Sequence, residues 1–586
     1  MRRTWIVAAL ILAAAAAGAQ PAKTDDAAAR LRALLEEAWQ DELRADPLLA
    51  TSVGDHRYDD RLPDASREEL DRQAAAARRR LDQLHALDRA VLPRADRVSY
   101  DMYERQLGDG LAGYEHGSWR IPITADSGFH TGFAQMPREV PLATARDHES
   151  YIARLRAYPA YVRQYVALMR EGLRTGFTLP RIVLEGYDVT VRTHVVDAPE
   201  KSVFWEPFRA FPPGVPDADR ELLRAAGRDA VMQGAVAGYR EFLDFMVREY
   251  VPGARATTAA SDLPGGRAYY EHLVRAFTTL PLTPEQVHQT GLREVERITA
   301  EMMQVMQRAG FQGELTAFLE FLRTDKRFFV TTPEQLLKEA SWIAKRMDGK
   351  LPSLFGRLPR LPYGVEPVPG HLAPKYTAGR YVPAPVGGTR AGTYWVNTYG
   401  LESRTLWAME ALTLHEAVPG HHLQIALQQE LKGLPQFRTV SRVDAFVEGW
   451  ALYAERLGLE AGFYKDPYSD FGRLTYEMWR ACRLVVDTGL HAKGWTRQQA
   501  MDYLAAHTAL SRHEIRTEVD RYISWPGQAL AYKTGELKIR ELRAKAEREL
   551  GSRFDVRAFH DAVLANGAVP LAVLDEQVDE FIAARR

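Results

Sequence analysis

The stretch "LTLHEAVPGHHLQIA", residues 412 to 426, decides how the rest of the chain is interpreted. It begins like a metal-binding H-E-x-x-H helix, because His415 and Glu416 are adjacent in an apolar context. In that motif the second histidine comes four residues after the first, on the same face of one helix. Pro419 occupies that position here, so the ordinary geometry cannot form.

Pro419 predicts a break in the helix. It lacks the N–H that would bond the carbonyl of His415, and its ring clashes with that carbonyl. The next residue, Gly420, permits an unusual turn. We therefore expect one helix, roughly 403 to 417, to kink or end here and a second to begin near His421.

Two adjacent histidines compete to be the second ligand. His422, seven residues after His415, lies about 10 Å along the axis of a straight helix. Two ligands that each lie about 2 Å from one zinc ion cannot be so far apart. His421 needs the smaller bulge, so we favour it and keep His422 as a neighbour that supports the site.

A third ligand is expected downstream, because a zinc hydrolase needs three protein ligands and an open position for water. The amphipathic stretch "RVDAFVEGWALYAERLGLEAG" carries Glu448, far enough from His421 for a helix, a turn and a return. Glu455, two turns further on, is the competitor and more naturally orients a ligand histidine. Glu416 is placed to act as a base beside the metal-bound water.

These segments resemble a known family. "HEAVPGHHLQ", "VEGWALYAE", "GRYVPAPVGGTRAGTYWVNT" and "TEVDRYISWPGQALAYKTGELKI" are similar to the bacterial family called domain of unknown function 885. That family is grouped with the HExxH-type, gluzincin-like metallopeptidases. The resemblance implies a mainly α-helical enzyme, like the helical oligopeptidases and dipeptidyl carboxypeptidases. It also implies Zn²⁺ bound by His415, His421 and Glu448, with Glu416 as base, and it implies no particular substrate.

Further catalytic groups are sought in the C-terminal stretch "EVDRYISWPGQALAYKTG". Zinc peptidases stabilise an oxyanion with a donor besides the metal, and Arg521, Tyr522 and Tyr532 are candidates. His491, in "DTGLHAKGW", is a weaker candidate. The alternative is that the tyrosines pack in the core, that Arg521 pairs with an acid and that His491 is structural.

Strand signals are few and lie just before the motif. In "GRYVPAPVGGTRAGTYWVNTYG", residues 379 to 400, aromatic and β-branched residues favour strands and Gly387-Gly388 offers a turn. A strand near 393 to 398 is expected beside the motif helix. Its edge could bind an extended peptide through main-chain hydrogen bonds, with Arg390 and Asn397 as substrate contacts. A surface hairpin without a ligand is the alternative.

Helical periodicity dominates elsewhere and predicts a mainly α fold with a small β-sheet next to the motif helix. Thr283, Pro284 and Gln286 form the N-terminal signature of a helix. The Pro/Gly-rich stretch 351 to 374 is either a linker or an ordered loop across a cleft. Apolar residues recur every three or four positions over 26–43, 67–87, 149–173, 218–249 and 334–347.

The N-terminus predicts export. "MRRTWIVAALILAAAAAGAQ" has two arginines, a short apolar run and an A-x-A cleavage site, so residues 1–19 are expected to be a signal peptide. An uncleaved membrane anchor is the alternative. No cysteine lies near the cleavage site, which disfavours a lipoprotein. We expect a periplasmic or secreted protein without stable membrane insertion, with an N-terminal helical region at 20–280 and a catalytic region at 281–586, or one continuous unit.

Composition narrows the function classes. The chain has 586 residues and a net charge of −1, so nothing suggests a nucleic-acid partner. The single cysteine, Cys482, cannot form an internal disulfide and is expected to be buried. The sequence predicts a zinc peptidase acting on short peptides. The alternatives are a zinc hydrolase of another amide or ester, and a non-catalytic periplasmic binding or scaffold protein.

Overall fold

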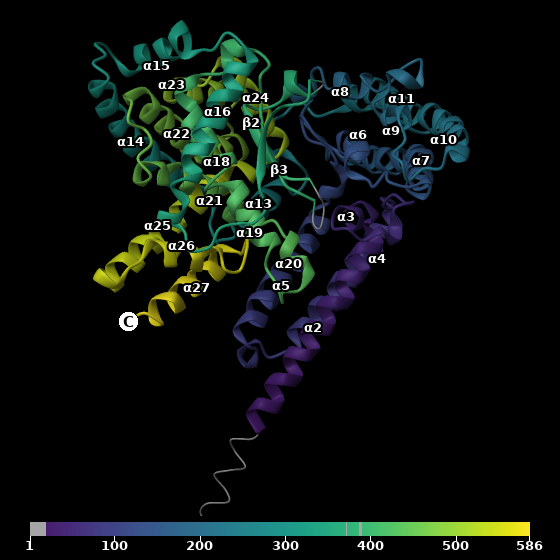
Figure 1. The fold of residues 1–586 in the computed structure, drawn as a ribbon, viewed down its shortest axis with the longest axis horizontal. Coiled ribbons are helices and arrows are strands. Elements are labelled where there is room, and N and C mark those ends of the chain that lie inside the picture. Colours follow the sequence, from purple (N-terminus) through teal and green to yellow (C-terminus); the bar gives the residue numbers. More distant parts are fainter. Residues whose placement is uncertain (1–18, 371, 386–389) are drawn as a thin grey trace, which may run out of the picture.

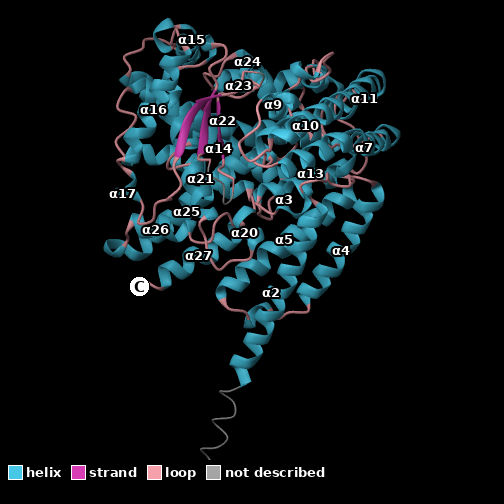
Figure 2. Ribbon diagram, turned by 45° about the vertical axis from the view of Figure 1, so that its right-hand side comes forward, coloured by secondary structure: helices cyan, strands magenta, loops and turns pink. Residues whose placement is uncertain are grey.

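A computed structural model describes residues 19–370, 372–385 and 390–586. The expected signal peptide, apart from its last residue, and the turn at Gly387-Gly388 lie outside the described residues. The described chain is mainly α-helical with one small sheet, as the sequence predicts (Figure 2). Within these ranges, no helix is long and apolar enough to cross a bilayer.

The first half of the chain forms two groups of helices. The helices in purple and dark blue in Figure 1 are α2 (Ala19–Ala45), α3 (Pro47–Ser52), α4 (Arg67–His85) and α5 (Arg94–His116). The blue bundle at the right contains α6 (Phe129–Glu139), α7 (Ala145–Thr175), α8 (Asp188–Arg192), α9 (Glu206–Arg209) and a long rod. That rod consists of α10 (Asp217–Asp229), α11 (Ala237–Phe245) and α12 (Val251–Gly253), joined by the π-helical segments Ala230–Val236 and Met246–Tyr250.

The second half forms the larger body at the left of Figure 1. Before the sheet come α13 (Gly266–Thr278), α14 (Pro284–Arg308), α15 (Leu315–Thr324), α16 (Pro333–Asp348) and α17 (Leu351–Leu354). After it come α18 (Met409–Glu416), α19 (His421–Gln429), α20 (Gln436–Val440), α21 (Asp444–Glu460) and α22 (Pro467–Ala492). The chain ends with α23 (Arg497–His507), α24 (Arg512–Ser524), α25 (Ala531–Leu550), α26 (Val556–Leu564) and α27 (Leu571–Ala583).

The predicted start of α14 is confirmed. The Thr283 hydroxyl accepts a hydrogen bond from the Gln286 amide at 3.2 Å, and the Gln286 side chain accepts one from the Thr283 amide at 2.9 Å. Pro284 occupies the first helical position, where a missing N–H costs nothing. This capping box fixes the helix that packs along α22, the buried helix carrying Cys482.

The sheet has three strands in the order β1-β3-β2. They are β1 (Tyr363–Pro367), β2 (Gly379–Val382) and β3 (Gly392–Val396), with β1 parallel and β2 antiparallel to β3. The stretch expected as a linker or loop therefore contributes β1. The expectation that the strand near 393–398 offers an open edge is wrong, because β3 is the central strand. Both β2 and β3 contact α18, since the Tyr394 hydroxyl of β3 lies 3.4 Å from the Thr413 hydroxyl.

One apolar core connects both halves. It contains buried residues from Ala27 on α2 to Ile582 on α27. The hydrophobic core therefore crosses the boundary near residue 280 that the sequence suggested.

Helices α21 and α25 approach each other at two glycines. A Cβ built on Gly449 would lie 2.5 Å from the Gly535 Cα, and one on Gly535 would lie 1.8 Å from the Ala445 carbonyl oxygen. Real side chains do not tolerate such distances, so both positions require glycine. The contact places the segment around Tyr532 beside the segment around Glu448.

Replacing Gly449 or Gly535 with alanine should therefore lower the free energy of unfolding by about 1–3 kcal/mol, because the added carbon meets main chain that cannot rotate away. Urea unfolding measures this. Gly110→Ala is the matched control: a Cβ added at this exposed glycine of α5 would meet no atom within 4 Å, so the change should stabilise by about 0.5–1 kcal/mol. Equal effects at all three positions would contradict the close helix contact.

Candidate metal centre

The chain breaks at the proline, as the sequence predicts. Helix α18 ends at Glu416 and α19 begins at His421, although α18 starts only at Met409 rather than near 403. A Cβ on Gly420 would lie 1.9 Å from the His415 carbonyl oxygen, so only glycine lets the chain turn back this closely. The turn brings the first residue of α19 close to the end of α18.

Helix α21 holds this turn in place. The indole nitrogen of Trp450, which is fully buried, donates to the Pro419 carbonyl at 2.9 Å. Trp450 follows Gly449, the residue of closest approach to α25. One short segment of α21 therefore contacts both the bulge and α25.

Three buried side chains from α18, α19 and α21 meet at the bulge. The Nε2 atoms of His415 and His421 lie 3.7 and 3.5 Å from Glu448 Oε2. All three potential ligand atoms lie within 4.8 Å of one another. Ligands about 2.0–2.2 Å from a tetrahedral zinc ion are separated by about 3.3–3.6 Å, so these atoms can share one ion with little movement.

The predicted orienting carboxylate is also present. His415 Nδ1 donates to Glu455 Oε1 at 2.8 Å, which leaves the Nε2 lone pair directed at the shared volume. The Tyr464 hydroxyl donates to the Glu455 carbonyl at 2.7 Å and fixes this part of α21. A carboxylate behind a ligand histidine sets the tautomer and increases the basicity of the ring.

The charges favour a cation at the centre. Burial alone would lower the pKa of His415, but Glu448 and Glu455 outweigh it and raise the pKa to about 9. Burial would raise the pKa of Glu448, yet His421 and His415 hold it well below its usual range. Two imidazole nitrogens and one carboxylate are also a donor set that suits Zn²⁺, so the residues present fit the metal.

His422 faces away from this group. Its Nδ1 is hydrogen-bonded to the Tyr381 hydroxyl at 3.0 Å, and its ring packs on Tyr363 with centroids 4.5 Å apart. Burial lowers its pKa to about 4, so the ring is neutral at physiological pH. His422 thus ties α19 to the sheet, in agreement with the choice of His421 as the ligand candidate.

Glu416 lies beside the ligand group and is held by the sheet. The Tyr381 main-chain N–H of β2 donates to Glu416 Oε2 at 2.8 Å. The Glu416 charge also helps to raise the pKa of His415, so the two groups are close. The edge strand and the motif helix therefore fix the position of the carboxylate that the sequence assigned as base.

Among the predicted donors, Tyr532 is connected to the ligand group through Arg442. Arg521 Nη2 donates to the Tyr532 hydroxyl at 3.3 Å. Tyr532 is one of the groups that raise the pKa of Arg442, and Arg442 forms an ion pair with Glu448 Oε1. Tyr532 and Arg521 therefore lie at the margin of the ligand group.

The structure gives two other predicted catalytic residues structural roles. The Tyr522 hydroxyl accepts hydrogen bonds from Trp479 Nε1 at 2.9 Å and Arg483 Nε at 3.0 Å. His491 Nδ1 accepts from the Ala260 amide at 2.9 Å, and its Nε2 donates to the Tyr522 carbonyl at 3.0 Å. Because these polar atoms already have partners, we do not assign Tyr522 or His491 to the reaction.

The two predicted substrate contacts are also corrected. Asn397 is fully buried, and its amide nitrogen donates to three carbonyls of the preceding loop, those of Ala373, Tyr376 and Thr377. Arg390 is exposed two residues before β3, and its charge acts on Glu139 of α6. Asn397 organises the loop, and neither residue belongs to the ligand group.

Sequence reasoning missed Arg442. Besides its ion pair with Glu448, its Nε lies 2.6 Å from Asp444 Oδ1. Arg442 precedes the first residue of α21, so helical periodicity could not place it on the same side as Glu448. A basic residue six positions before the candidate ligand was the only available signal.

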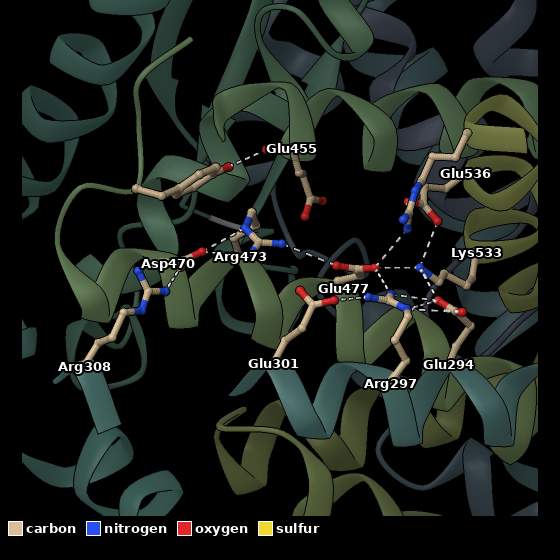
Figure 3. A network of polar contacts seen from close by, with 12 residues as sticks. Glu294, Arg297, Glu301, Arg308, Glu455, Asp470, Arg473, Glu477, Lys533 and Glu536 are labelled. Carbon is tan, nitrogen blue, oxygen red and sulfur yellow. Dashed lines mark hydrogen bonds and ion pairs between the residues drawn. The ribbon is translucent and has the colours of Figure 1, made fainter. Parts of the chain in front are cut away.

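A buried network of charged side chains connects α25 to α14 and α22 (Figure 3). The Lys533 ammonium has no solvent exposure and lies 2.8 Å from Glu477 and Glu536 and 3.1 Å from Glu294. These carboxylates come from α22, α25 and α14, so the network fixes the helix next to Tyr532. Removing one member of such a buried group leaves uncompensated charge, which is strongly destabilising.

Purified wild-type protein should bind one zinc ion, and His415→Ala, His421→Ala and Glu448→Gln should each lose stoichiometric zinc. Glu455→Gln should retain all three ligands but lower zinc affinity about 10- to 100-fold, because it orients His415. Metal analysis after dialysis, with competition against a chelator, measures both effects. His422→Ala is the control and should bind zinc like wild type. The ligand assignment fails if His422→Ala loses zinc while His421→Ala keeps it.

Comparisons with known proteins support a common fold. The crystal structure of "the putative lipoprotein from Colwellia psychrerythraea" is 27% identical, with a TM-score of 0.88 over 95% of this chain and 99% of that one. A structure of "a putative lipoprotein of unknown function from Shewanella oneidensis" is 18% identical, with a TM-score of 0.69 over 93% and 99% of the two chains. At 18% identity, the second structure shows only that the fold is shared.

No curated protein matches the chain. Residues 47–578 match the family described as "Bacterial protein of unknown function (DUF885)". Because this match covers most of the sequence, the chain belongs to that family.

Proposed function

We propose that the chain is a zinc-dependent peptidase that hydrolyses short peptides. His415, His421 and Glu448 would hold Zn²⁺, and Glu416 would act as general base. The convergence of the three ligand atoms within 4.8 Å, beside the Glu416 carboxylate, carries the proposal. The grouping with gluzincin-like metallopeptidases is part of the same proposal.

The chain's own residues supply the proton transfers. A bound Zn²⁺ would polarise the scissile carbonyl and lower the pKa of water. Glu416 takes a proton from the attacking water and passes it to the leaving nitrogen. The Tyr381 amide holds Glu416 Oε2 at 2.8 Å, which leaves Oε1 for this transfer. The Tyr532 hydroxyl is the donor for the developing oxyanion.

Strand β2 supports a peptide as the substrate. Among the described residues β2 pairs with β3 alone, and its other edge faces α18, since the Tyr381 amide reaches Glu416. An extended peptide can bind along such an edge through main-chain hydrogen bonds. The Tyr381 amide is bound to Glu416, so the Gly379 main chain and the Tyr381 carbonyl would take the role first given to the side chains of Arg390 and Asn397.

Two alternatives use parts of the same arrangement. A zinc hydrolase of another amide or ester would need the same ligands and the same base, and it would differ in the pocket. A non-catalytic binding or scaffold protein needs no base, so a buried Glu416 held by a main-chain amide argues against it. A panel of short peptides, small amides and esters distinguishes the three.

Export is part of the proposal. Residues 1–19 have the pattern of a signal peptide. Two similar structures are described as those of putative lipoproteins, a class of exported bacterial protein. We propose a periplasmic or secreted location for this chain.

Glu416→Gln should lower kcat on short peptides by about 10²- to 10⁴-fold while retaining zinc, because it removes the proton acceptor and none of the metal ligands. Tyr532→Phe should lower kcat about 10²- to 10³-fold, because it removes only the hydroxyl that faces the oxyanion. Steady-state kinetics and metal analysis on the same samples measure both changes.

Tyr522→Phe is the matched control, since the Tyr522 hydroxyl is bonded to Trp479 and Arg483. Tyr522→Phe should lower the free energy of unfolding and change kcat little. If Glu416→Gln leaves every substrate's turnover unchanged, the role of Glu416 is refuted. If Tyr522→Phe lowers kcat as much as Tyr532→Phe, the choice of Tyr532 is wrong.

A further inference from the structure

Three guanidinium groups gather beside the candidate metal centre. Arg442 is paired with Glu448 and Asp444. Arg521 donates to Gln528 at 2.7 Å and to Tyr532 at 3.3 Å. The third group belongs to Arg380 on β2. These groups come from three separate segments, so the fold rather than local sequence brings them together.

Arg380 is the guanidinium without a counter-ion. Burial is the largest influence on the pKa of Arg380 and would lower it. The Tyr376 hydroxyl has the opposite effect, and overall the pKa is raised. The positive charges of Arg442 and Arg521 oppose this rise, so both groups act electrostatically on Arg380. No carboxylate is paired with Arg380 among the residues that the structure describes.

Arg521 is also short of negative charge. The nearest carboxylate oxygen is Glu518 Oε1 at 3.6 Å, and the other oxygen of that carboxylate lies 2.8 Å from Arg483. One carboxylate is thus shared between two guanidinium groups. A metal cation at the ligand group would use the charge of Glu448 and leave a still larger excess of positive charge.

All three arginine side chains are accessible to solvent. Protein surrounds Arg442 and Arg521 closely enough that desolvation is the largest influence on the pKa of each. Their side chains nevertheless keep 52% and 22% of their surface exposed, and Arg380 is exposed as well. An anion from solvent can therefore reach all three guanidinium groups.

Arg380 and Arg521 lie next to the groups assigned to the reaction. Arg380 precedes Tyr381, whose amide binds Glu416, and alternation along β2 directs its side chain away from the face on which Tyr381 contacts His422. Arg521 binds the hydroxyl of Tyr532. The two cations therefore flank the position where a substrate would be cleaved.

We propose that Arg380, with Arg521, binds a carboxylate of the substrate. This inference rests on the proposed peptidase function and specifies its substrate class: peptides that present a carboxylate close to the scissile bond. If that group is the chain terminus, the enzyme acts as a carboxypeptidase. If it is an aspartate or glutamate side chain, the enzyme selects acidic peptides. Guanidinium groups suit either source, because they bind carboxylates in a bidentate way.

The test compares three blocked tetra-alanine peptides on the zinc-loaded full chain. One ends in a free carboxylate, one in an amide, and the third is the amide with glutamate as its last residue. Wild type should cleave the free acid at least about tenfold more efficiently than the plain amide. Arg380→Gln should lower kcat/KM for the free acid about 10- to 100-fold, mainly through KM, because a charged hydrogen bond is lost. The plain amide should change less than about twofold.

Arg516→Gln, at an exposed arginine of the same helix as Arg521, is the matched control and should change neither substrate. If wild type cleaves the glutamate amide efficiently and Arg380→Gln does not, the carboxylate that binds belongs to a side chain. The inference is overturned if wild type cleaves acid and plain amide equally, or if Arg380→Gln lowers both to the same extent.

A binding experiment separates this inference from the proposed function. The same peptides are titrated calorimetrically into zinc-loaded Glu416→Gln protein, with and without Arg380→Gln. If the acid and the amide are hydrolysed equally and bind equally, the proposed peptidase function stands and the proposed carboxylate site is refuted. If binding of the acid depends on Arg380 but wild type hydrolyses none of the peptides, the carboxylate site stands and the peptidase function is refuted. Absence of binding to every peptide overturns the inference.

Discussion

Glu448 lies between two imidazoles and a guanidinium in a buried volume, and the surrounding elements are arranged to hold it there. A carboxylate that is 4% exposed must be paired, because desolvation of an isolated charge is very costly. Arg442 takes one of its oxygens, and the other faces His415 and His421. The contacts that bring the candidate ligands together are therefore the same contacts that balance the buried charge of Glu448.

Three backbone features bring this group together. The proline bulge lets α19 start close to the end of α18, so that His421 can reach the same point as His415. The Gly449–Gly535 contact brings α25 against α21. Strand β2 supplies the Tyr381 amide that holds Glu416. Each feature uses main-chain geometry to place a charged side chain. Two of them, the bulge and the helix contact, depend on proline or glycine.

The sequence predicted the parts of the site whose geometry is local. The bulge follows from Pro419 and Gly420, the choice of His421 from helix rise, and the role of Glu455 from its distance along α21. The start of α14 was predictable for the same reason, since the Thr283 capping box involves only neighbouring residues.

Features that depend on distant segments could not be predicted. Tyr522 and Tyr532 looked alike in sequence, and only packing against Trp479 and Arg483 separates them. The strand at 363–367 was hidden in a Pro/Gly-rich stretch, and its pairing makes β3 the central strand. Arg442 and Arg380 lie outside the helical repeats, so their position beside the candidate ligand group is visible only in three dimensions.

Anomalous diffraction at the zinc edge, from crystals of the zinc-loaded protein, tests the central claim most directly. The account predicts one strong peak about 2.0–2.2 Å from His415 Nε2, His421 Nε2 and a Glu448 oxygen, with the Glu416 carboxylate beside it. A peak coordinated by His422, or no peak at the bulge in protein that contains stoichiometric zinc, would contradict it.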